Sequence, residues 1–200
     1  MALYRVKPTK VDEAVAHAVA RHTAPVPEEA AQILSWGGDE HLLIALAAGF
    51  WLYGRTADEQ TRIASNHVLL TTAAVTLLPH LLKRIFDQER PDRTTIRGHL
   101  HGVSFSGKAL DSFPSGHALH VGALASAATE LAPAERNAVW IIGAGLALTR
   151  LALLAHWLSD VLAGLAIGAM VERLLRFWTG YSRMAGQDCH GSDRDSARRR

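Results

Sequence analysis

Residues 138–158 read AVWIIGAGLALTRLALLAHWL, an apolar run that carries a single formal charge, Arg150. The run reaches the roughly 20 residues that a helix needs to cross the hydrocarbon core of a bilayer. Gly143, Gly145 and several alanines give it the small-residue content that suits tightly packed membrane helices. This stretch therefore predicts a long helix inside a membrane-embedded protein.

Four further apolar segments accompany this run, and their repetition strengthens the prediction. They cover residues 42–54, 68–82, 118–132 and 161–178. A helix that is apolar all round must be buried, and a soluble domain of 200 residues rarely has room for five of them. We therefore expect an all-α fold, a membrane-embedded helical bundle with about five apolar helices. A soluble helical bundle is the alternative.

The two ends of the chain differ from this apolar middle. Within residues 9–22 apolar residues recur near helical spacing, which predicts an N-terminal amphipathic helix lying at a surface or membrane interface. The tail is rich in Ser, Asp and Arg, a composition typical of disorder. We expect an N-terminal amphipathic, interfacial segment (1–40), a helical bundle (41–179) and a disordered basic tail (180–200).

Charge and cysteine content exclude several classes. The net charge is only +2, so we expect no nucleic-acid partner. The single cysteine, Cys189, excludes an internal disulfide and a cysteine metal cluster. Basic residues gather instead in one connecting segment: Lys83, Arg84, Arg90, Arg93, Arg97 and Lys108. A local basic cluster beside apolar helices suits a compact anionic ligand.

Arg150, His156 and Asp160 form the first group of candidate site residues. Charged residues inside apolar helices are costly, so they indicate function by default. On a continuous helix His156 and Asp160 share a face, where the carboxylate accepts a hydrogen bond from one imidazole nitrogen. The other nitrogen is then free to act as a nucleophile. The alternative is a structural salt-bridged trio at a helix end.

Residues 113–117 read FPSGH and precede the third apolar segment. Pro, Ser and Gly in series predict a turn with Ser115 as the helix N-cap. The N–H groups at such a helix start bind anions, and His117 would stand beside them. The alternative is an ordinary cap with a solvated histidine.

Lys83 directly follows the second apolar segment, and Arg90 lies in the long polar loop over residues 87–112 that comes next. A lysine and an arginine can clamp phosphate oxygens, the arginine through two parallel hydrogen bonds. The alternative is a basic anchor at the membrane edge. His99 and His101 of the loop are weaker candidates for contact with a substrate.

In combination, these three groups resemble the signature of the type-2 phosphatidic acid phosphatase superfamily. Lys83, six residues and then Arg90-Pro91 resemble its first motif, and Pro114-Ser115-Gly116-His117 matches its second. The third motif is matched by Arg150, His156 and Asp160, with five residues between the first two and three between the last two. The three motifs come in the family's order. One departure is Thr149, where the family usually has serine.

The resemblance implies a metal-independent reaction with a phosphohistidine intermediate. His156 is then the nucleophile, Asp160 orients it, and His117 protonates the leaving oxygen. The resemblance also implies a set of residues that bind the phosphate: Lys83, Arg90, Ser115, Gly116 and Arg150. No metal and no cofactor is expected.

The substrate implied by the resemblance is a lipid phosphate or a polyprenyl pyrophosphate, bound from the membrane. The implied location is the bacterial inner membrane, as a multi-pass protein whose active site faces the extracytoplasmic side. A phosphotransferase that passes a phosphoryl or head group to a lipid acceptor would carry the same motifs. A vanadate-dependent haloperoxidase would share the phosphate cage, and a non-catalytic protein could use the same residues only to bind a lipid phosphate.

Overall fold

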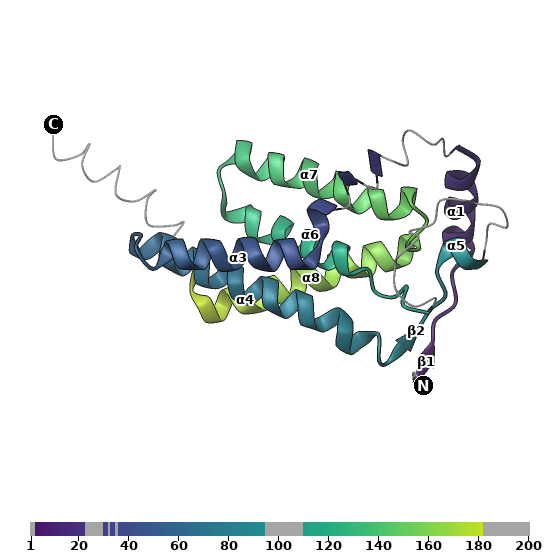
Figure 1. Ribbon diagram of the computed structural model, residues 1–200, viewed down its shortest axis with the longest axis horizontal. Helices are drawn as coiled ribbons and strands as arrows, with labels where there is room; N and C mark the ends of the chain where they lie inside the picture. Colours follow the sequence, from purple (N-terminus) through teal and green to yellow (C-terminus); the bar gives the residue numbers. More distant parts are fainter. Residues whose placement is uncertain (1–2, 23–29, 32, 35, 95–109, 182–200) are drawn as a thin grey trace, which may run out of the picture.

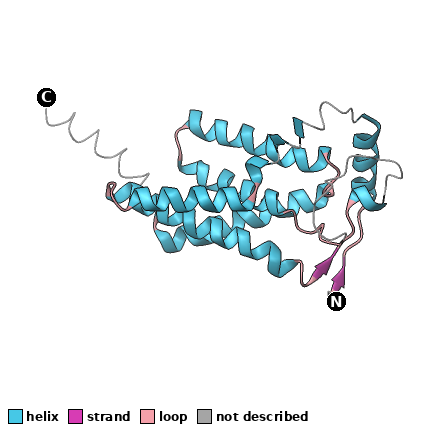
Figure 2. Ribbon diagram, viewed as in Figure 1, coloured by secondary structure: helices cyan, strands magenta, loops and turns pink. Residues whose placement is uncertain are grey.

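The computed structural model describes residues 3–22, 30–31, 33–34, 36–94 and 110–181. Within these residues the chain is mostly helical, as the sequence predicts, and Figure 2 shows strands only at one corner. The five bundle helices are α3 (Glu40–Gly54), α4 (Glu59–Leu82), α6 (Gly116–Ala127), α7 (Pro133–Ala152) and α8 (Leu158–Thr179).

The smaller elements gather mainly at one end of the bundle. They are α1 (Lys10–His22), α5 (Pro91–Thr94), the short helices η1 (Trp36–Gly38) and η2 (Ala128–Glu130), and strands β1 (Tyr4–Arg5) and β2 (Phe86–Asp87). The strands pair in parallel, with Tyr4 opposite Phe86. In Figure 1, α1, α5 and the two strands lie together at the right-hand end. That end also holds the predicted site.

The two largest differences between the helices and the apolar segments of the sequence are at the start of α4 and the end of α7. Helix α4 begins nine residues before the predicted start at 68, because the carboxylate of Asp58 accepts hydrogen bonds from the N–H and hydroxyl of Thr61, both at 2.9 Å. Helix α7 ends at Ala152 rather than at residue 158. The longest apolar run is therefore divided between a helix and the turn that follows it.

Helices α6 and α8 pack with their backbones close together, and glycines make this possible. A Cβ atom on Gly122 would lie 2.1 Å from the carbonyl oxygen of Leu165, and one on Gly168 would lie 2.0 Å from that of Leu119. A Cβ atom on Gly164 would likewise lie 2.7 Å from the carbonyl oxygen of Ser115. The GxxxG spacing of Gly164 and Gly168 thus marks the face that α8 presents to α6.

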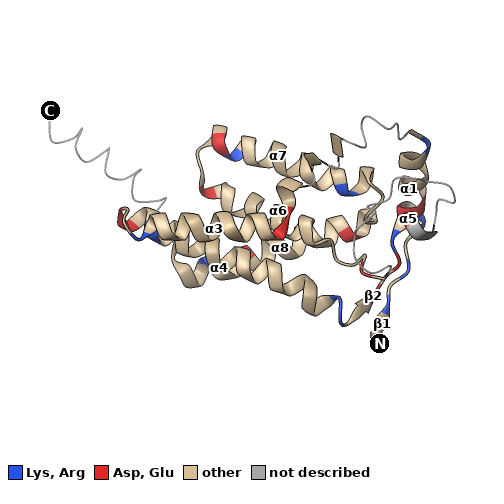
Figure 3. Cartoon of the chain, in the orientation of Figure 1, with Lys and Arg blue, Asp and Glu red and all other residues tan. Residues whose placement is uncertain are grey.

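Charged residues lie mainly towards the ends of the long helices, and their middles carry few (Figure 3). Many large apolar side chains are exposed on the outside of the bundle, among them Leu46, Leu77, Ile141 and Phe177. Among the described residues, no helix combines the length and the apolar character needed to cross a membrane.

Candidate active site

One polar pocket of about 350 Å³ lies where the ends of α4 and α7 meet the start of α6. Six of the predicted site residues line it: Lys83, Arg90, Gly116, His117, Arg150 and His156. The fold thus brings residues from three separate parts of the sequence around one space. Ser115 and Asp160, the other two, are buried beside the pocket and do not line it.

His156 lies in the tight turn between α7 and α8. The N–H groups of Ala155 and His156 both donate to the carbonyl oxygen of Arg150, at 3.1 and 3.3 Å. Leu154 takes a left-handed conformation with φ 51°, which side chains rarely adopt. The single helix that would carry both His156 and Asp160 is therefore not formed, because this turn interrupts it.

The Nδ1 atom of His156 donates to the carbonyl oxygen of Ser112 at 2.7 Å, with the tautomer assigned from this contact. The Oδ2 atom of Asp160 lies 3.8 Å from Nδ1, too far for the direct hydrogen bond that the sequence predicts. That oxygen accepts instead from the Ser112 hydroxyl at 2.6 Å and the Trp157 N–H at 2.9 Å. Asp160 therefore acts on His156 through Ser112 and the turn.

Burial and nearby charge keep His156 neutral. Its side chain is 4% exposed. Burial, followed by the positive charges of Arg150, Arg90 and Lys83, lowers the pKa of His156 well below its usual value. With Nδ1 donating to a carbonyl, the unprotonated Nε2 keeps its lone pair, as a nucleophile requires.

Three cations surround the same space. Arg90 and Arg150 are 4% and 6% exposed, and Arg90 donates to the carbonyl oxygen of Ala155 at 3.2 Å. The Nε of Arg150 has no hydrogen-bond partner among the described residues. Burial and the charge of Arg90 lower the pKa of Lys83. A bound anion would relieve the repulsion among these three side chains.

His117 is the second residue of α6 and is half-buried. Its ring packs against Gly38, where a Cβ atom would lie 2.5 Å from Cδ2 of the imidazole. Gly116 begins the helix, so its N–H has no acceptor within α6. Ser115 takes the N-cap position, although its hydroxyl makes no capping bond and has no partner among the described residues.

Several residues of the site carry no signal in the sequence. Ser112 contributes through its backbone carbonyl, which accepts from His156, and through its hydroxyl, which donates to Asp160. Asp39, Glu40 and Asp111 bring carboxylates to the pocket, and His120 adds a second imidazole from α6. Of these, Asp39 and Glu40 could have been noticed, as acidic residues at the start of an apolar segment. The predicted contacts of His99 and His101 lie outside the described residues.

Comparison with known proteins places this geometry in a family. The sequence model of the PAP2 superfamily matches residues 64–184. A lipid A 1-phosphatase of Rhizobium johnstonii is 34% identical over 165 residues, covering 76% of this chain and 68% of that protein. A lipid A 1-phosphatase of Rhizobium etli is also 34% identical, over 160 residues that cover 74% and 69% of the two chains.

Two solved structures share the fold. One is the transmembrane PAP2-type phosphatidylglycerolphosphate phosphatase of Bacillus subtilis, with TM-score 0.61 and 22% identity over 84% of this chain and 83% of that chain. The other is LpxE of Aquifex aeolicus, with TM-score 0.60 and 15% identity over 81% of this chain and 92% of that chain.

The helical bundle and its cationic pocket thus define a class of phosphate-processing enzymes. The chain belongs to the PAP2 superfamily, and it is a phosphatase.

Proposed function

We propose that this phosphatase hydrolyses the phosphate monoester or pyrophosphate of a lipid through a phosphohistidine at His156. The Nε2 atom attacks phosphorus, and His117 protonates the leaving oxygen. His117 then activates the water that releases phosphate. The arrangement of His117 and His156 around one pocket of about 350 Å³ supports this division of roles.

The proposed reaction needs no metal, because fixed cations supply the charge. Phosphoryl transfer depends mainly on positioning and on stabilising charge on the equatorial oxygens. Lys83, Arg90 and Arg150 line the same pocket. The orphan N–H of Gly116 and the unpartnered hydroxyl of Ser115 are proposed as further donors to the phosphate.

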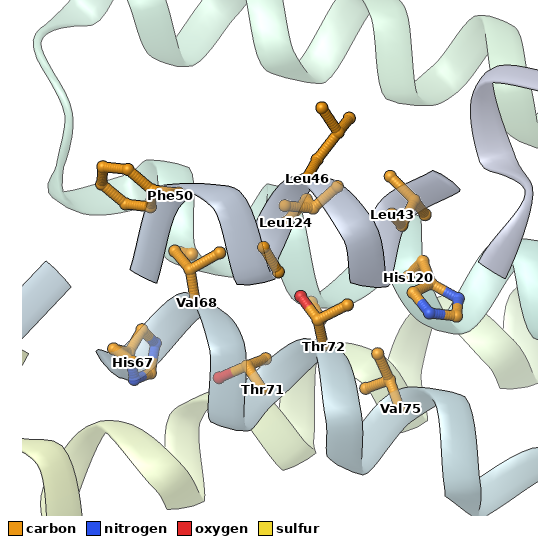
Figure 4. Close-up of a pocket in the computed structure, with 13 residues that line it drawn as sticks. Leu43, Leu46, Phe50, His67, Val68, Thr71, Thr72, Val75, His120 and Leu124 are labelled. Atoms are coloured by element: carbon orange, nitrogen blue, oxygen red, sulfur yellow. The ribbon is translucent and has the colours of Figure 1, made fainter. Parts of the chain in front are cut away.

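The observation that carries the lipid assignment is an apolar cavity beside the phosphate pocket. It has a volume of about 260 Å³ and lies between α3, α4 and α6 (Figure 4). Leu43, Leu46, Phe50 and Val68 line much of it, and His120 lines both this cavity and the polar pocket. An acyl or isoprenoid chain would lie here with its phosphate among the cations.

The two Rhizobium relatives suggest which lipid to test first. Both are lipid A 1-phosphatases, so the 1-phosphate of lipid A becomes the first proposed substrate. Phosphatidic acid, phosphatidylglycerol phosphate and a polyprenyl pyrophosphate complete the panel.

We also propose that the bundle lies in a bacterial inner membrane. The exposed apolar side chains support this, and a relative of the same fold is described as transmembrane.

The active site would face the extracytoplasmic side and residues 180–200 the cytoplasm, since the tail is basic. Cys189 allows a direct test: an impermeant thiol reagent should label it in inverted vesicles and not in intact spheroplasts.

Phosphate release from the lipid panel tests the function. Purified wild type and His156→Ala would be compared in detergent with EDTA present. Release by the wild type alone supports a metal-independent histidine phosphatase. Transfer of the phosphoryl group to an added lipid, without free phosphate, would favour a phosphotransferase. Equal release by His156→Ala would overturn the assignment of the nucleophile.

A further inference from the structure

The N-terminal segment, which the three motifs do not cover, contacts the active-site end at two places. Strand β1 pairs with β2, which follows Lys83 by a few residues. The N–H of Tyr4 donates to the carbonyl oxygen of Ile85 at 2.9 Å. Helix α1 then packs across the turn that carries His156 (Figure 1). The segment therefore lies against two of the three motifs.

Asp12 makes the second contact, and it is 2% exposed. Its Oδ1 accepts from the Ser159 N–H at 2.8 Å, and its Oδ2 accepts from the Ser159 hydroxyl at 2.9 Å. The N–H and hydroxyl of Thr9 hold Oδ2 from the other side, both at 2.8 Å. Burial alone would raise the pKa of Asp12, but these hydrogen bonds outweigh it and lower the pKa, so the carboxylate is charged.

Ser159 is the second residue of α8, where an N-cap side chain usually accepts a backbone hydrogen bond. The N-cap residue of α8 is Trp157, whose indole has no acceptor oxygen. Asp12 therefore supplies from α1 the cap that α8 cannot supply itself. Its charge also lies at the positive end of the helix, where a carboxylate is stabilising.

The capped turn holds His156, the proposed nucleophile, and Asp160, the carboxylate that supports it through Ser112. Asp160 follows Ser159 directly, and the Trp157 N–H bonds to its carboxylate at 2.9 Å. His156 precedes Trp157, and Ala16 of α1 packs with Leu154 and Trp157 on either side of it. Asp12 and His156 also line the same small cavity of about 10 Å³. A movement of Ser159 would thus displace Asp160 and His156.

We propose that Asp12 is a positioning residue for phosphoryl transfer, which caps α8 from α1 and thereby holds His156 in line with the bound phosphate. This inference rests on the proposed chemistry at His156. Asp12 touches neither substrate nor reacting atoms, so its loss should slow the attack on phosphorus and leave the binding of the phosphate largely intact.

The test compares Asp12→Ala with Glu13→Ala, which removes an equal charge from the exposed neighbouring position. The readouts are kcat, KM and the rate of phosphohistidine formation, measured well below each variant's unfolding temperature. We expect Asp12→Ala to lower kcat and the rate of phosphohistidine formation together by about 10- to 100-fold, by analogy with the loss of residues that orient metal ligands. KM should change little, and Glu13→Ala should match the wild type.

Asp12→Asn provides a second measurement if the alanine variant does not fold. Its amide oxygen can still accept from the Ser159 N–H, so it should recover part of the lost kcat. Wild-type rates in folded Asp12→Ala would overturn the inference, and so would a change confined to KM in either variant. If the wild type forms no phosphohistidine, the proposed function fails; if it does and Asp12→Ala forms it equally fast, only this inference fails.

Discussion

His156 and Ser112 are joined by a hydrogen bond of 2.7 Å from the imidazole Nδ1 to a backbone carbonyl, while Asp160 stays 3.8 Å from the same nitrogen. The tautomer of His156, the proposed nucleophile, is therefore set by the backbone and not by a carboxylate. Asp160 supports this arrangement by holding the Ser112 hydroxyl at 2.6 Å.

Neutralising Asp160 should therefore cost less than in a triad where the carboxylate bonds the histidine directly, a loss of about 10⁴-fold. In Asp160→Asn the remaining amide oxygen can accept from Trp157 or Ser112. We expect kcat to fall by about 10- to 100-fold, as for other indirect partners of a reacting group. Steady-state phosphate release measures it, and a loss as large as that of His156→Ala would contradict the indirect role.

Gly38→Ala should displace His117, the proposed general acid. The added Cβ would lie 2.5 Å from Cδ2 of His117, so the imidazole must move. A misplacement of about 1 Å near the reacting atoms can cost about 100-fold in rate. We expect kcat to fall by about that factor for a substrate with a poor leaving group. The loss should be smaller for p-nitrophenyl phosphate, because its leaving group needs little protonation.

Gly49→Ala is the matched control for this prediction. Nothing lies within 4 Å of a Cβ atom at Gly49, and the residue is inside helix α3. Its activity should equal that of the wild type. Equal losses in the two variants would show that the effect is not specific to His117.

The acid limb of the pH profile should report the charges around His156. The pKa of His156 is lowered by burial and by Arg150, Arg90 and Lys83. The imidazole therefore stays neutral at pH values below its ordinary pKa of 6.5. In Lys83→Met one of these charges is lost, the pKa of His156 rises, and the acid limb of kcat moves to higher pH. Lys83→Arg keeps the charge and should keep the limb in place. A shift to lower pH in Lys83→Met would contradict the electrostatic account.

A buried ionic cluster whose members do not line the polar pocket should govern stability and not chemistry. Glu172 is fully buried and accepts from His67 at 3.0 Å, Ser126 at 2.5 Å and Arg176 at 2.8 Å. Glu172→Ala should lower the free energy of unfolding by about 3–5 kcal/mol, because its partners are left buried. Glu59→Ala, at an exposed site, should cost less than about 0.5 kcal/mol.

Thermal unfolding in detergent measures this difference, and activity is assayed at low temperature. We expect kcat of Glu172→Ala to stay near that of the wild type while the protein is folded. A large loss of kcat at full folding would show that the cluster is coupled to the active site.

The sequence predicts the helical class and the site residues because both depend on local patterns. Apolar runs locate the helices, and the spacing of Arg150, His156 and Asp160 locates the third motif. The turn between α7 and α8 escapes such reasoning, because residues 152–155 are apolar and favour a helix. It forms because Arg90 binds the Ala155 carbonyl and the Arg150 carbonyl accepts two N–H groups, contacts that only the folded chain brings together.

The role of Asp12 is hidden from the sequence for a related reason. As a helix-start carboxylate it is consistent with an ordinary first-turn acidic residue. Its link to Ser159 joins positions 147 residues apart, and no local pattern predicts such a pair. The short strands β1 and β2 likewise pair residues far apart in the sequence, Tyr4 with Phe86.

The central claim is that the phosphoryl group passes through His156, and trapping the intermediate tests it most directly. Enzyme is mixed with ³²P-labelled substrate, quenched in alkali and digested. We predict label that is stable in alkali and labile in acid, on the peptide that contains His156. None should form in His156→Ala, and label should accumulate in His117→Ala when the leaving group needs no proton. Label on another residue, or undiminished labelling of His156→Ala, would contradict the account.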